Sequence, residues 1–438
     1  MFYVYAGRHT LHKAEGSPCP WRRFIKGCSF ACVLLLIFWG MIATSLAQGI
    51  ERNSMAGESE AEASHNSNLG AQPYNLQLGP VNLRVDAGSS VMYNDNINLA
   101  NSGKQEDIIL SPSIGIHGQW QATELNALTF DIGVSYLKYL THSNYDNFLI
   151  APNSQTQFKI FIGDFTITLY DSFSYQQDPV QVGQLSNISQ FDRFTNDAGF
   201  IVNWDLADLI VSLEYDHNNF LVFQQAYTYL DYQSDAVSPK VTFKLNKTME
   251  AGLSASVSAI RYDQDIQNNY TQFQAGPFIT DEVSDNLSLQ AQIGWDYTKF
   301  AQGGLNGDTT QSVSSPYGNA GITHRVNDAL KESLTVGREF LPGITSNYTD
   351  RIYANYTPTW HATSLFDIAP QLWWENLNDS AATVRETSNR FGLNFNIYLA
   401  VTQHASVNLG YSYVIKRSDQ TSLNYYQDVI TLGLNYQF

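Results

Sequence analysis

Apolar and polar residues alternate one by one along most of the chain. The alternation extends from residue 81 to residue 438 and is clearest in the segments 128–136, 253–259, 287–297, 391–399, 405–413 and 430–438. A period of two indicates β-strands with one apolar face, because successive side chains point to opposite sides of a sheet. Each apolar face spans about 9–11 residues, the length that a tilted strand needs to cross a bilayer.

The connections between these segments are alternately short and long. Short links are expected near residues 121–124, 163–164, 205–207, 246–248, 283–285, 327–328, 361–363 and 401–403. Longer polar loops are expected at 94–106, 140–153, 177–190, 219–232, 263–270, 301–311, 342–346, 377–385 and 417–423. Short periplasmic turns and long extracellular loops are typical of outer-membrane barrels. The spacing predicts about 18 strands, within a range of about 16 to 20, with both chain ends on the short-turn side.

Backbone hydrogen bonding then sets the fold class. Inside lipid every N–H and C=O group needs a partner within the protein, so strands that span a membrane must close into a barrel. We therefore predict an all-β fold, a transmembrane antiparallel up-and-down β-barrel. A barrel of about 16–18 strands is wide enough to hold an aqueous channel. The alternative, a soluble β-sandwich or propeller, does not explain the alternating loop lengths.

The first residues carry a different signal. An apolar run at 27–43 follows Arg22, Arg23 and Lys26, and the small-residue sequence Ser45-Leu46-Ala47 comes after it. This order is typical of a secretory signal peptide, which we assign to residues 1–47. The alternative is a single transmembrane anchor. Residues 48–80 are polar and without period, which predicts a flexible periplasmic leader, and residues 81–438 form the predicted barrel.

Composition excludes several other classes of protein. Of the 438 residues, 15% are charged and 13% aromatic, which argues against disorder. Only one apolar run is long enough for a membrane helix, which argues against a helical bundle. The formal net charge of −17 argues against a nucleic-acid partner, which would need clusters of Lys and Arg. All three cysteines lie within residues 1–47, so the exported chain has no disulfide.

Aromatic residues concentrate at the expected membrane boundaries. We predict an aromatic girdle of six tryptophans, beside the short turns (Trp120, Trp204, Trp360) and toward the long loops (Trp295, Trp373, Trp374). The chain ends in Tyr436-Gln437-Phe438. Tyr436 and Phe438 resemble the C-terminal signal of bacterial outer-membrane proteins. That resemblance implies recognition by the barrel-assembly machinery and location in the outer membrane of a Gram-negative-type bacterium, after export by the Sec route.

The first two predicted strands carry a short motif. Residues 83–88 lead into Tyr93-Asn94-Asp95-Asn96-Ile97, and Asp107-Ile108-Ile109-Leu110-Ser111-Pro112 opens the next strand. This pattern resembles the outer-membrane β-barrel porin family associated with exopolysaccharide and capsule export loci. The resemblance implies a conduit for, or an accessory to, secreted polysaccharide, with polysaccharide export components as partners beside the membrane lipid.

Charged residues on the polar faces are candidates for the lumen. Arginine or lysine facing lipid at the midplane costs about 2–4 kcal/mol, so the inner face is favoured. These charges either pair across the bore and solvate it or set ion and solute selectivity. Glu332 and Arg338 fall on the apolar side of their strand, which indicates a bulge or an interfacial position. The predicted lumen-facing residues are Arg84, Asp86, Asp131, Glu214, Asp216, Lys240, Lys244, Asp296, Arg351, Asp367, Glu375 and Arg390.

No motif of known chemistry occurs in the sequence. The phosphate-binding, zinc-protease, serine-hydrolase and dinucleotide patterns are absent, and the histidines lack the spacing of metal ligands. We therefore predict no cofactor, no metal and no catalytic residue. The nearest hydrolytic group is His142 beside Ser143, which lacks an orienting third partner in the sequence.

These observations predict a channel for small hydrophilic solutes or saccharide chains, which cross passively through a polar lumen. The acidic excess predicts a mild preference for cations. The alternatives are a barrel with a blocked lumen that binds partners during polysaccharide secretion, and a barrel hydrolase.

Overall fold

The computed structural model describes residues 74–152, 154–363, 365–380 and 385–438. The predicted signal peptide and most of the predicted leader lie outside these ranges. The strands are β1 (Leu76–Leu78), β2 (Val81–Asn94), β3 (Asp107–Gln121), β4 (Ala127–Tyr139), β5 (Asn147–Ile150), β6 (Gln155–Ile162), β7 (Phe165–Gln176), β8 (Arg193–Asp205), β9 (Leu209–Val222), β10 (Tyr232–Lys244), β11 (Met249–Tyr262), β12 (Tyr270–Ser284), β13 (Leu287–Phe300), β14 (Ser312–Asn327), β15 (Leu330–Pro342), β16 (Tyr348–Thr363), β17 (Phe366–Asp379), β18 (Thr387–Ala400), β19 (Ala405–Ser418) and β20 (Tyr425–Gln437). Short 3₁₀ turns occur at η1 (Ser143–Tyr145), η2 (Pro179–Gln181), η3 (Thr228–Leu230) and η4 (Thr421–Leu423).

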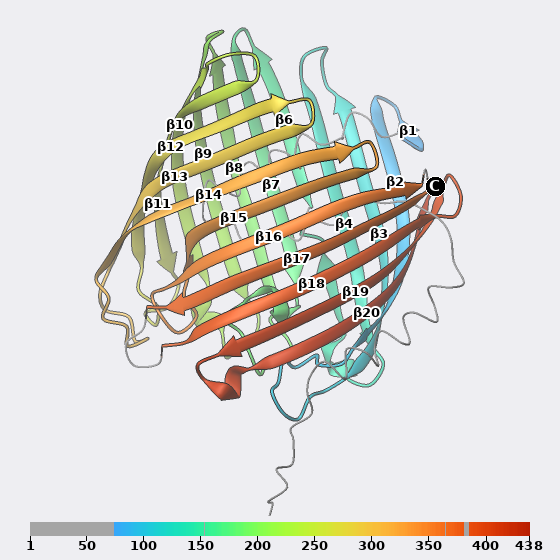
Figure 1. Ribbon diagram of the computed structural model, residues 1–438, viewed down its shortest axis with the longest axis vertical. Coiled ribbons are helices and arrows are strands. Elements are labelled where there is room, and N and C mark those ends of the chain that lie inside the picture. The colour runs from blue at the N-terminus through green and yellow to red at the C-terminus, as the bar shows by residue number, and fades with distance from the viewer. Residues whose placement is uncertain (1–73, 153, 364, 381–384) are drawn as a thin grey trace, which may run out of the picture. The chain divides into compact units, whose positions relative to one another are not determined.

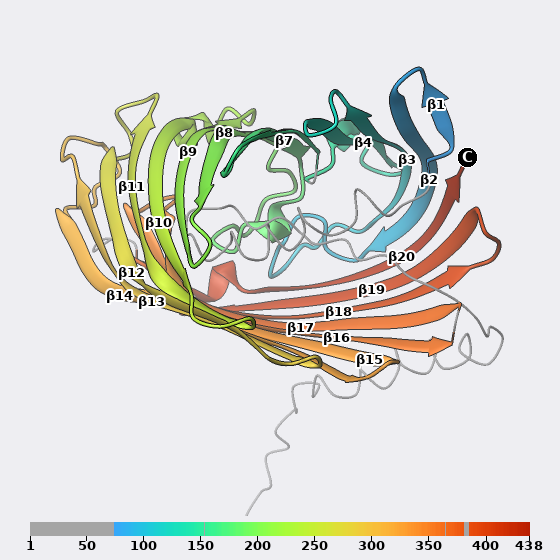
Figure 2. The same ribbon diagram turned by 90° about the horizontal axis from the view of Figure 1, so that it is seen from above.

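The strands form one closed antiparallel barrel (Figures 1 and 2). Each strand from β6 onward pairs with the next, and β20 returns to β2, where Ala87 lies opposite Tyr436. Strand β1 pairs only with β2, and β5 and β6 share one position in the wall between β4 and β7. The wall therefore has 18 strand positions. The predicted fold class and strand number are confirmed.

The split strand shows how the wall admits an irregularity. Strand β4 pairs first with β5, where Val134 lies opposite Ile150, and then with β6, where Asp131 lies opposite Gln155. At the break the amide of Gly133 donates to the Ser154 hydroxyl at 3.1 Å. A Cβ on Gly133 would lie 2.8 Å from the Cβ of Ala151, so glycine permits the close approach. The predicted loop at 140–153 is shorter than expected, because β5 continues the wall.

One strand also lies before the predicted barrel boundary at residue 81. Strand β1 lies within the predicted leader, yet it forms a hairpin with β2 through a turn in which Gly79 has φ of 60°. The Asn75 side chain reinforces this hairpin, donating to the Val85 carbonyl at 2.8 Å and accepting from the Val85 amide at 3.1 Å. The end of segment 48–80 is therefore a strand and not a flexible leader.

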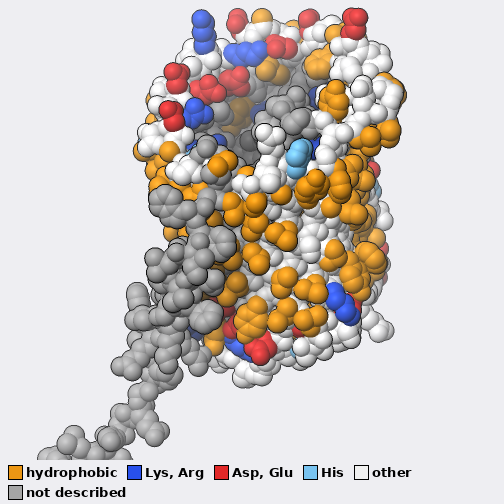
Figure 3. Space-filling model, turned by 90° about the vertical axis from the view of Figure 1, so that its right-hand side faces the viewer, with side chains coloured by type: hydrophobic (Ala, Val, Ile, Leu, Met, Phe, Trp, Pro, Cys, Tyr) orange, Lys and Arg blue, Asp and Glu red, His pale blue; other side chains and the backbone are white. Residues whose placement is uncertain are grey.

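The outer surface of the barrel is apolar. On β3 the exposed residues Ile108, Leu110, Ile114 and Ile116 alternate with residues whose side chains lie on the inner face. Large hydrophobic side chains are exposed in the same alternating way on most other strands, and they form the orange surface in Figure 3. Such a surface is stable in hydrocarbon and not in water, so the barrel is built to sit in a membrane. Among the described residues, no helix is long and apolar enough to cross one.

The two ends of the barrel differ inside. We call the end that carries the short turns the turn half and the end that carries the long connections the loop half. Nearly all buried apolar residues lie in the loop half, in three clusters around Phe191, Ile97 and Leu99. At the turn half the barrel is hollow, with charged side chains on its rim (Figure 3).

Candidate functional site: the lumen and the loop that crosses it

The long connection between β7 and β8 folds into the barrel. We call residues 177–192 the inner loop. It begins with η2, where the Asp178 carboxylate accepts a hydrogen bond from the Val180 amide at 3.0 Å. The Arg193 guanidinium fixes the base of the loop, donating to Gln176 Oε1 at 2.6 Å and Gln181 Oε1 at 2.7 Å.

Polar contacts fix the tip of the inner loop to the far wall. Lys416 on β19 donates to the Gln184 carbonyl at 3.2 Å, and Arg390 on β18 donates to the Val180 carbonyl. The Gln184 side chain donates to the Pro342 carbonyl at 3.0 Å. Further along, the Ser186 hydroxyl donates to the Leu423 carbonyl at 2.9 Å. The loop therefore crosses the lumen, with its two ends on β7 and β8 and its tip on β15, β18 and β19.

Apolar side chains complete this closure. Leu185 and Phe191 of the inner loop are buried against Phe220, Tyr232 and Phe300 from the surrounding strands. Val182 and Ile188 pack on the edge of the same cluster. The sequence contained a signal for this arrangement, since a loop exposed to water has no reason to carry an apolar residue every few positions. We predicted a polar outer loop here and missed that signal.

A buried charge network supports the far wall. Glu375 accepts from Arg351 Nε at 2.8 Å and from Arg390 Nη1 at 2.5 Å, and Arg351 also pairs with Glu339 at 2.7 Å. Lys416 pairs with Glu386 at 2.9 Å. The side chains of Arg390 and Lys416 are 4% and 0% exposed, so water does not screen these pairs.

The network brings together three predicted lumen residues, Arg351, Glu375 and Arg390. It also contains Glu339 and Lys416, which sequence reasoning did not select. Because Arg390 and Lys416 hold the inner loop, the charges position a constriction.

The first long connection also folds inward. Asn96 is fully buried, donates from Nδ2 to the Tyr426 carbonyl at 2.7 Å and accepts at its own carbonyl from Gln427 at 2.9 Å. Leu99 beside it accepts at its carbonyl from the Asn187 amide of the inner loop at 3.0 Å. Two loops therefore meet inside the loop half. Asn96, the last residue of the Tyr-Asn-Asp-Asn motif, fixes this connection to β20.

A second group of loops closes around Asp308. Its carboxylate accepts from the Asn347 amide at 2.8 Å, the Ser380 hydroxyl at 2.6 Å and the Thr310 amide at 2.8 Å. Burial alone would raise the pKa of Asp308, but these hydrogen bonds outweigh it and lower the pKa below its usual range. Gln267 and Asn268 join the same group, donating to Ile344 O at 2.6 Å and Asn347 Oδ1 at 2.8 Å.

The turn half carries a different set of side chains. His117 lies between two carboxylates, with Nε2 2.8 Å from Asp86 Oδ1 and Nδ1 3.0 Å from Asp131 Oδ2. All three side chains are about one-fifth exposed, and they face the hollow part of the lumen. The predicted lumen residues Asp86 and Asp131 thus belong to one site, and His117 is the partner that sequence reasoning did not select.

The remaining predicted lumen residues also lie on the inner face, opposite the exposed apolar side chains of their strands. Glu214 and Asp216 accept from Tyr170, and the Lys240 ammonium lies 4.8 Å from the ring centre of Phe278. Lys244 pairs with Asp205 at 3.0 Å, and Asp367 pairs with His361 at 2.6 Å. Asp296 is fully buried, and Arg84 lies next to the Asp86 site on β2. Their role in selectivity stays a prediction.

One wall of the lumen carries a ladder of amides. The Ser412 hydroxyl donates to Asn394 at 2.7 Å, Asn394 to Gln371 at 2.8 Å, and Gln371 to Asn355 at 3.1 Å. The ladder crosses β19, β18, β17 and β16 on the turn-half side of the charge network. Amides both donate and accept hydrogen bonds, as sugar hydroxyls do. The ladder gives the lumen a neutral polar wall beside its charged one.

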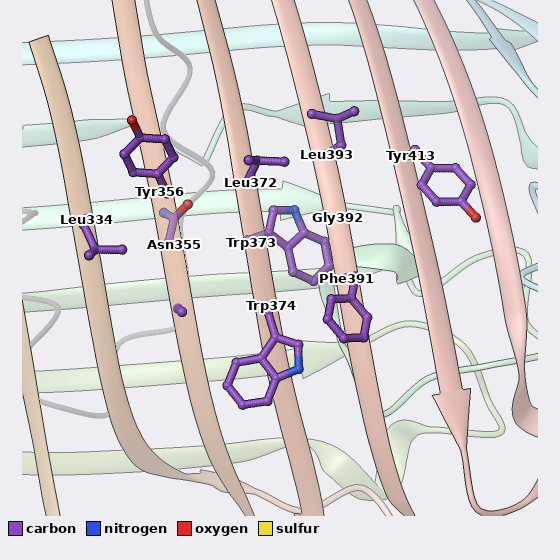
Figure 4. Close-up of a pocket in the computed structure, with 11 residues that line it drawn as sticks. Leu334, Asn355, Tyr356, Leu372, Trp373, Trp374, Phe391, Gly392, Leu393 and Tyr413 are labelled. Atoms are coloured by element: carbon purple, nitrogen blue, oxygen red, sulfur yellow. The ribbon is translucent and has the colours of Figure 1, made fainter. Parts of the chain in front are cut away.

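The structure corrects one member of the predicted aromatic girdle. Trp373 packs inside the barrel on the cluster around Leu99, with its ring centre 5.1 Å from the Arg390 guanidinium and its edge over Gly392 (Figure 4). Neighbouring residues of a strand point to opposite faces, so Trp373 and Trp374 cannot both face lipid. The other predicted girdle residues lie on the outer face: Trp120, Trp204, Trp295, Trp360 and Trp374.

The two charges on the apolar side of β15 are both paired on the outer face. Glu332 accepts from the Tyr356 hydroxyl at 2.9 Å and lies 3.1 Å from His324 Nδ1. Arg338 makes a two-point contact with Asp350 at 3.0 and 2.8 Å. The pairing of β15 with its two neighbours is continuous at both positions, so neither residue lies in a β-bulge. Both charges therefore occupy interfacial positions.

The candidate hydrolytic group has a structural role. The buried Asp107 carboxylate accepts from the backbone amides of Leu140, Thr141 and His142, and it lies 2.8 Å from His142 Nδ1. In the part of the chain that the structure describes, no hydrogen bond joins His142 to Ser143, and no group of three or more His, Cys, Asp or Glu side chains could hold a metal ion.

The similarity to known proteins lies in the path of the backbone and not in the sequence. No protein family and no curated protein matches the sequence. Among solved structures, a BenF-like porin from Pseudomonas fluorescens Pf-5 is 10% identical, with a TM-score of 0.47, over 82% of this chain and 100% of that one. The outer membrane protein opdK from Pseudomonas aeruginosa is 8% identical, with a TM-score of 0.46, over 82% and 98%. OccAB3 from Acinetobacter baumannii is 11% identical, with a TM-score of 0.44, over 81% and 99%. The assignment of this chain as an 18-stranded membrane barrel rests on its own strand pairing and its apolar outer face.

Proposed function

We propose that the protein is an outer-membrane channel through which small hydrophilic solutes or saccharide chains diffuse passively. The observation that carries the proposal is the inner face, which is polar from the turn-half mouth up to the inner loop. A lumen without a transport role could be filled with apolar side chains, as the loop half partly is. Side chains that hydrogen-bond to water, placed on the inner face of a wide barrel, instead favour a solvated passage.

The inner loop would set the size limit of this passage. It lies where the charge network, the first long connection and the Asp308 loops meet, so a solute that crosses must pass beside it or move it. In the turn half, His117 with its two aspartates and the amide ladder would contact the solute first. The amide ladder favours neutral polyhydroxylated solutes, which agrees with the resemblance to porins associated with exopolysaccharide loci.

The chain ends support the location that this function requires. Export by the Sec route would use residues 1–47, and insertion in a Gram-negative-type outer membrane would use the terminal Tyr436 and Phe438, which are exposed at the turn half. In this orientation the turn half faces the periplasm and the loop half faces the cell exterior.

Bilayer recording tests the proposal. Residues 48–438 are refolded into planar bilayers, and single-channel conductance is recorded while saccharides of graded size are added. We expect discrete open steps that sugars block up to a limiting size. A correctly folded barrel without steps at any voltage contradicts the channel function.

A second function is favoured by one observation, the buried contacts that fix the inner loop on both sides of the lumen. A barrel closed this firmly would act by binding partners, as an accessory to polysaccharide secretion. Conductance that appears only when the inner loop is removed would support this function over passive transport. Catalysis has no comparable support.

A further inference from the structure

The outer wall has an apolar hollow of about 380 Å³ (Figure 4). It lies over β16, β17 and β18. Its lining includes the small side chain of Ala354, whose neighbours across the strands are the much larger Val336 and Trp374. Outward-facing side chains that border the hollow are Leu334, Tyr356, Leu372, Trp374, Phe391 and Tyr413. The hollow is therefore open to the membrane and not to the lumen.

Its height in the wall follows from the register of β16. Trp360 lies on the outer face at the turn end, six residues from Ala354 and ten from Asp350. At about 3.3 Å per residue and a tilt of about 40°, Ala354 lies about 15 Å above Trp360 and Asp350 about 25 Å above it. The apolar band of such barrels is about 25 Å tall, so the hollow lies in the half nearer the long loops.

A polar belt borders the hollow on its loop-half side. On the outer face, Asn376 and Asn389 share a hydrogen bond of 3.2 Å, and the Trp374 indole donates to Asn389 at 3.3 Å. Arg417 pairs across the strands with Asn389 and is exposed. Arg338, already neutralised by Asp350, closes the other side of the belt.

Arg417 is the cation of this belt that is open to a ligand. It forms no ion pair with any other residue that the structure describes, and it lies four residues above Tyr413 on the same face of β19. Those four residues correspond to about 10 Å of height at the same rise and tilt. An exposed cation thus lies about 10 Å above an apolar hollow, on the same wall.

We propose that this wall binds one membrane lipid with an anionic headgroup, whose acyl chain fills the hollow and whose phosphate contacts Arg417 and the amides beside it. Two features favour a lipid. The hollow lies inside the hydrocarbon band, where an unfilled space would forfeit dispersion contacts. The belt supplies a cation and amides at one end only, which matches an amphiphile. This inference does not depend on the channel function.

Lipid retention tests the proposal. The full exported chain is placed in nanodiscs that contain equal amounts of phosphatidylglycerol and phosphatidylcholine, and native mass spectrometry counts the lipids that stay bound. We expect one retained phosphatidylglycerol for the wild type. Ala354→Leu adds three carbon atoms to the lining of the hollow, which narrows it, and should lower retention about tenfold. Ala291→Leu, the same change on the outer face of β13, is the matched control and should leave retention unchanged.

A second pair of variants separates the headgroup from the chain. Arg417→Gln should keep a bound lipid but lose the preference for phosphatidylglycerol, whereas Arg261→Gln, an exposed outer-face arginine on β11, should keep that preference. Equal retention by Ala354→Leu and Ala291→Leu overturns the proposal. A wild-type dimer that Ala354→Leu dissociates also overturns it, in favour of a second copy in the hollow. If Ala354→Leu does not fold, Ala354→Val tests the same point, with a smaller loss.

Discussion

The loop half and the turn half share the same 18 strand positions, yet they are built on different physical principles. In the loop half the inner loop, the first long connection and the Asp308 loops fill the lumen, and apolar side chains such as Phe191 and Leu99 are buried as in a soluble core. In the turn half the inner face carries partly exposed charges and amides around a hollow. The wall of a barrel therefore does not determine whether its lumen is open. The lumen is filled only where loops fold into it and bury apolar side chains.

Charges illustrate the same difference. Arg390 and Glu375 lie in the loop half, excluded from water, and each has several partners. Lys244 and Asp205 form a single pair at the turn-half rim, where their side chains are 30% and 55% exposed. The first kind of pair fixes a structure, whereas the second mainly solvates a mouth. Substitutions in the two halves should therefore have different effects.

Removal of the inner loop should have the largest effect. Gln176 and Arg193 lie opposite each other at the ends of β7 and β8, so a two-residue Asn-Gly turn can replace residues 177–192 without changing the wall. We expect a several-fold rise in single-channel conductance, because no segment would then cross the lumen from β7 and β8 to the far wall, although the other loops would still narrow it. The measurement is planar bilayer recording, with folding checked by the mobility of unheated protein in gels. Conductance equal to that of the wild type would show that the constriction lies elsewhere.

Removing one cation from each half should show how much more a buried ion pair stabilises the fold than an exposed one. Arg390→Gln leaves Glu375 buried with one partner fewer and frees the Val180 carbonyl, so we expect a loss of about 3–5 kcal/mol in the free energy of unfolding. Lys244→Gln, the matched control at the rim, should cost about 0–1 kcal/mol. Urea unfolding in detergent micelles provides both values. Equal losses would show that the Arg390 network is as solvated as the rim.

The sequence predicted the part of the molecule that follows from local alternation. The period of two, together with the alternating loop lengths, determines strand number, loop positions and the inner face, because each side chain's direction depends only on its strand. Trp373 lies on the face opposite to the predicted one, because the residue beside an outward-facing Trp374 points inward. Strand β1 was missed because three residues are too few to show a period.

The candidate site was less predictable, because it depends on contacts between distant residues. Lys416 contacts the inner loop 232 residues earlier in the chain, and Asn96 contacts Tyr426 330 residues later. Nothing in the sequence around Lys416 specifies that it is buried. The single local signal was the apolar content of the inner loop, from Val182 to Phe191, which indicated burial but not the wall against which the loop packs.

Acid should weaken one loop contact of the loop half. Hydrogen bonds lower the pKa of Asp308 below its ordinary value of 3.8, so its stabilising contribution is present above that pH and is lost as the pH falls through the lowered pKa. Asp308→Asn should cost about 1.5–3 kcal/mol at pH 7, with the difference from wild type shrinking below pH 3.8. Unfolding at a series of pH values measures this.

Asp285→Asn, in an exposed short turn, is the control for the acid experiment and should change little at any pH. If the difference in the free energy of unfolding between the wild type and Asp308→Asn stays constant down to the lowest pH, the lowered pKa of Asp308 is contradicted.

The smallest expected effect is a change in ion selectivity. Comparing the same substitution at two aspartates shows which part of the lumen ions encounter. Asp131 faces the hollow turn half beside His117, whereas Asp296 is fully buried and accepts from Gln272 at 2.5 Å and Gln274 at 2.7 Å. Asp131→Asn should shift the reversal potential in a salt gradient by a few millivolts toward anions, because a charge exposed to the bore attracts counterions. Asp296→Asn should leave the reversal potential unchanged and instead alter stability. If Asp296→Asn shifts selectivity as much as Asp131→Asn, ions reach the loop half, and the inner loop does not seal it.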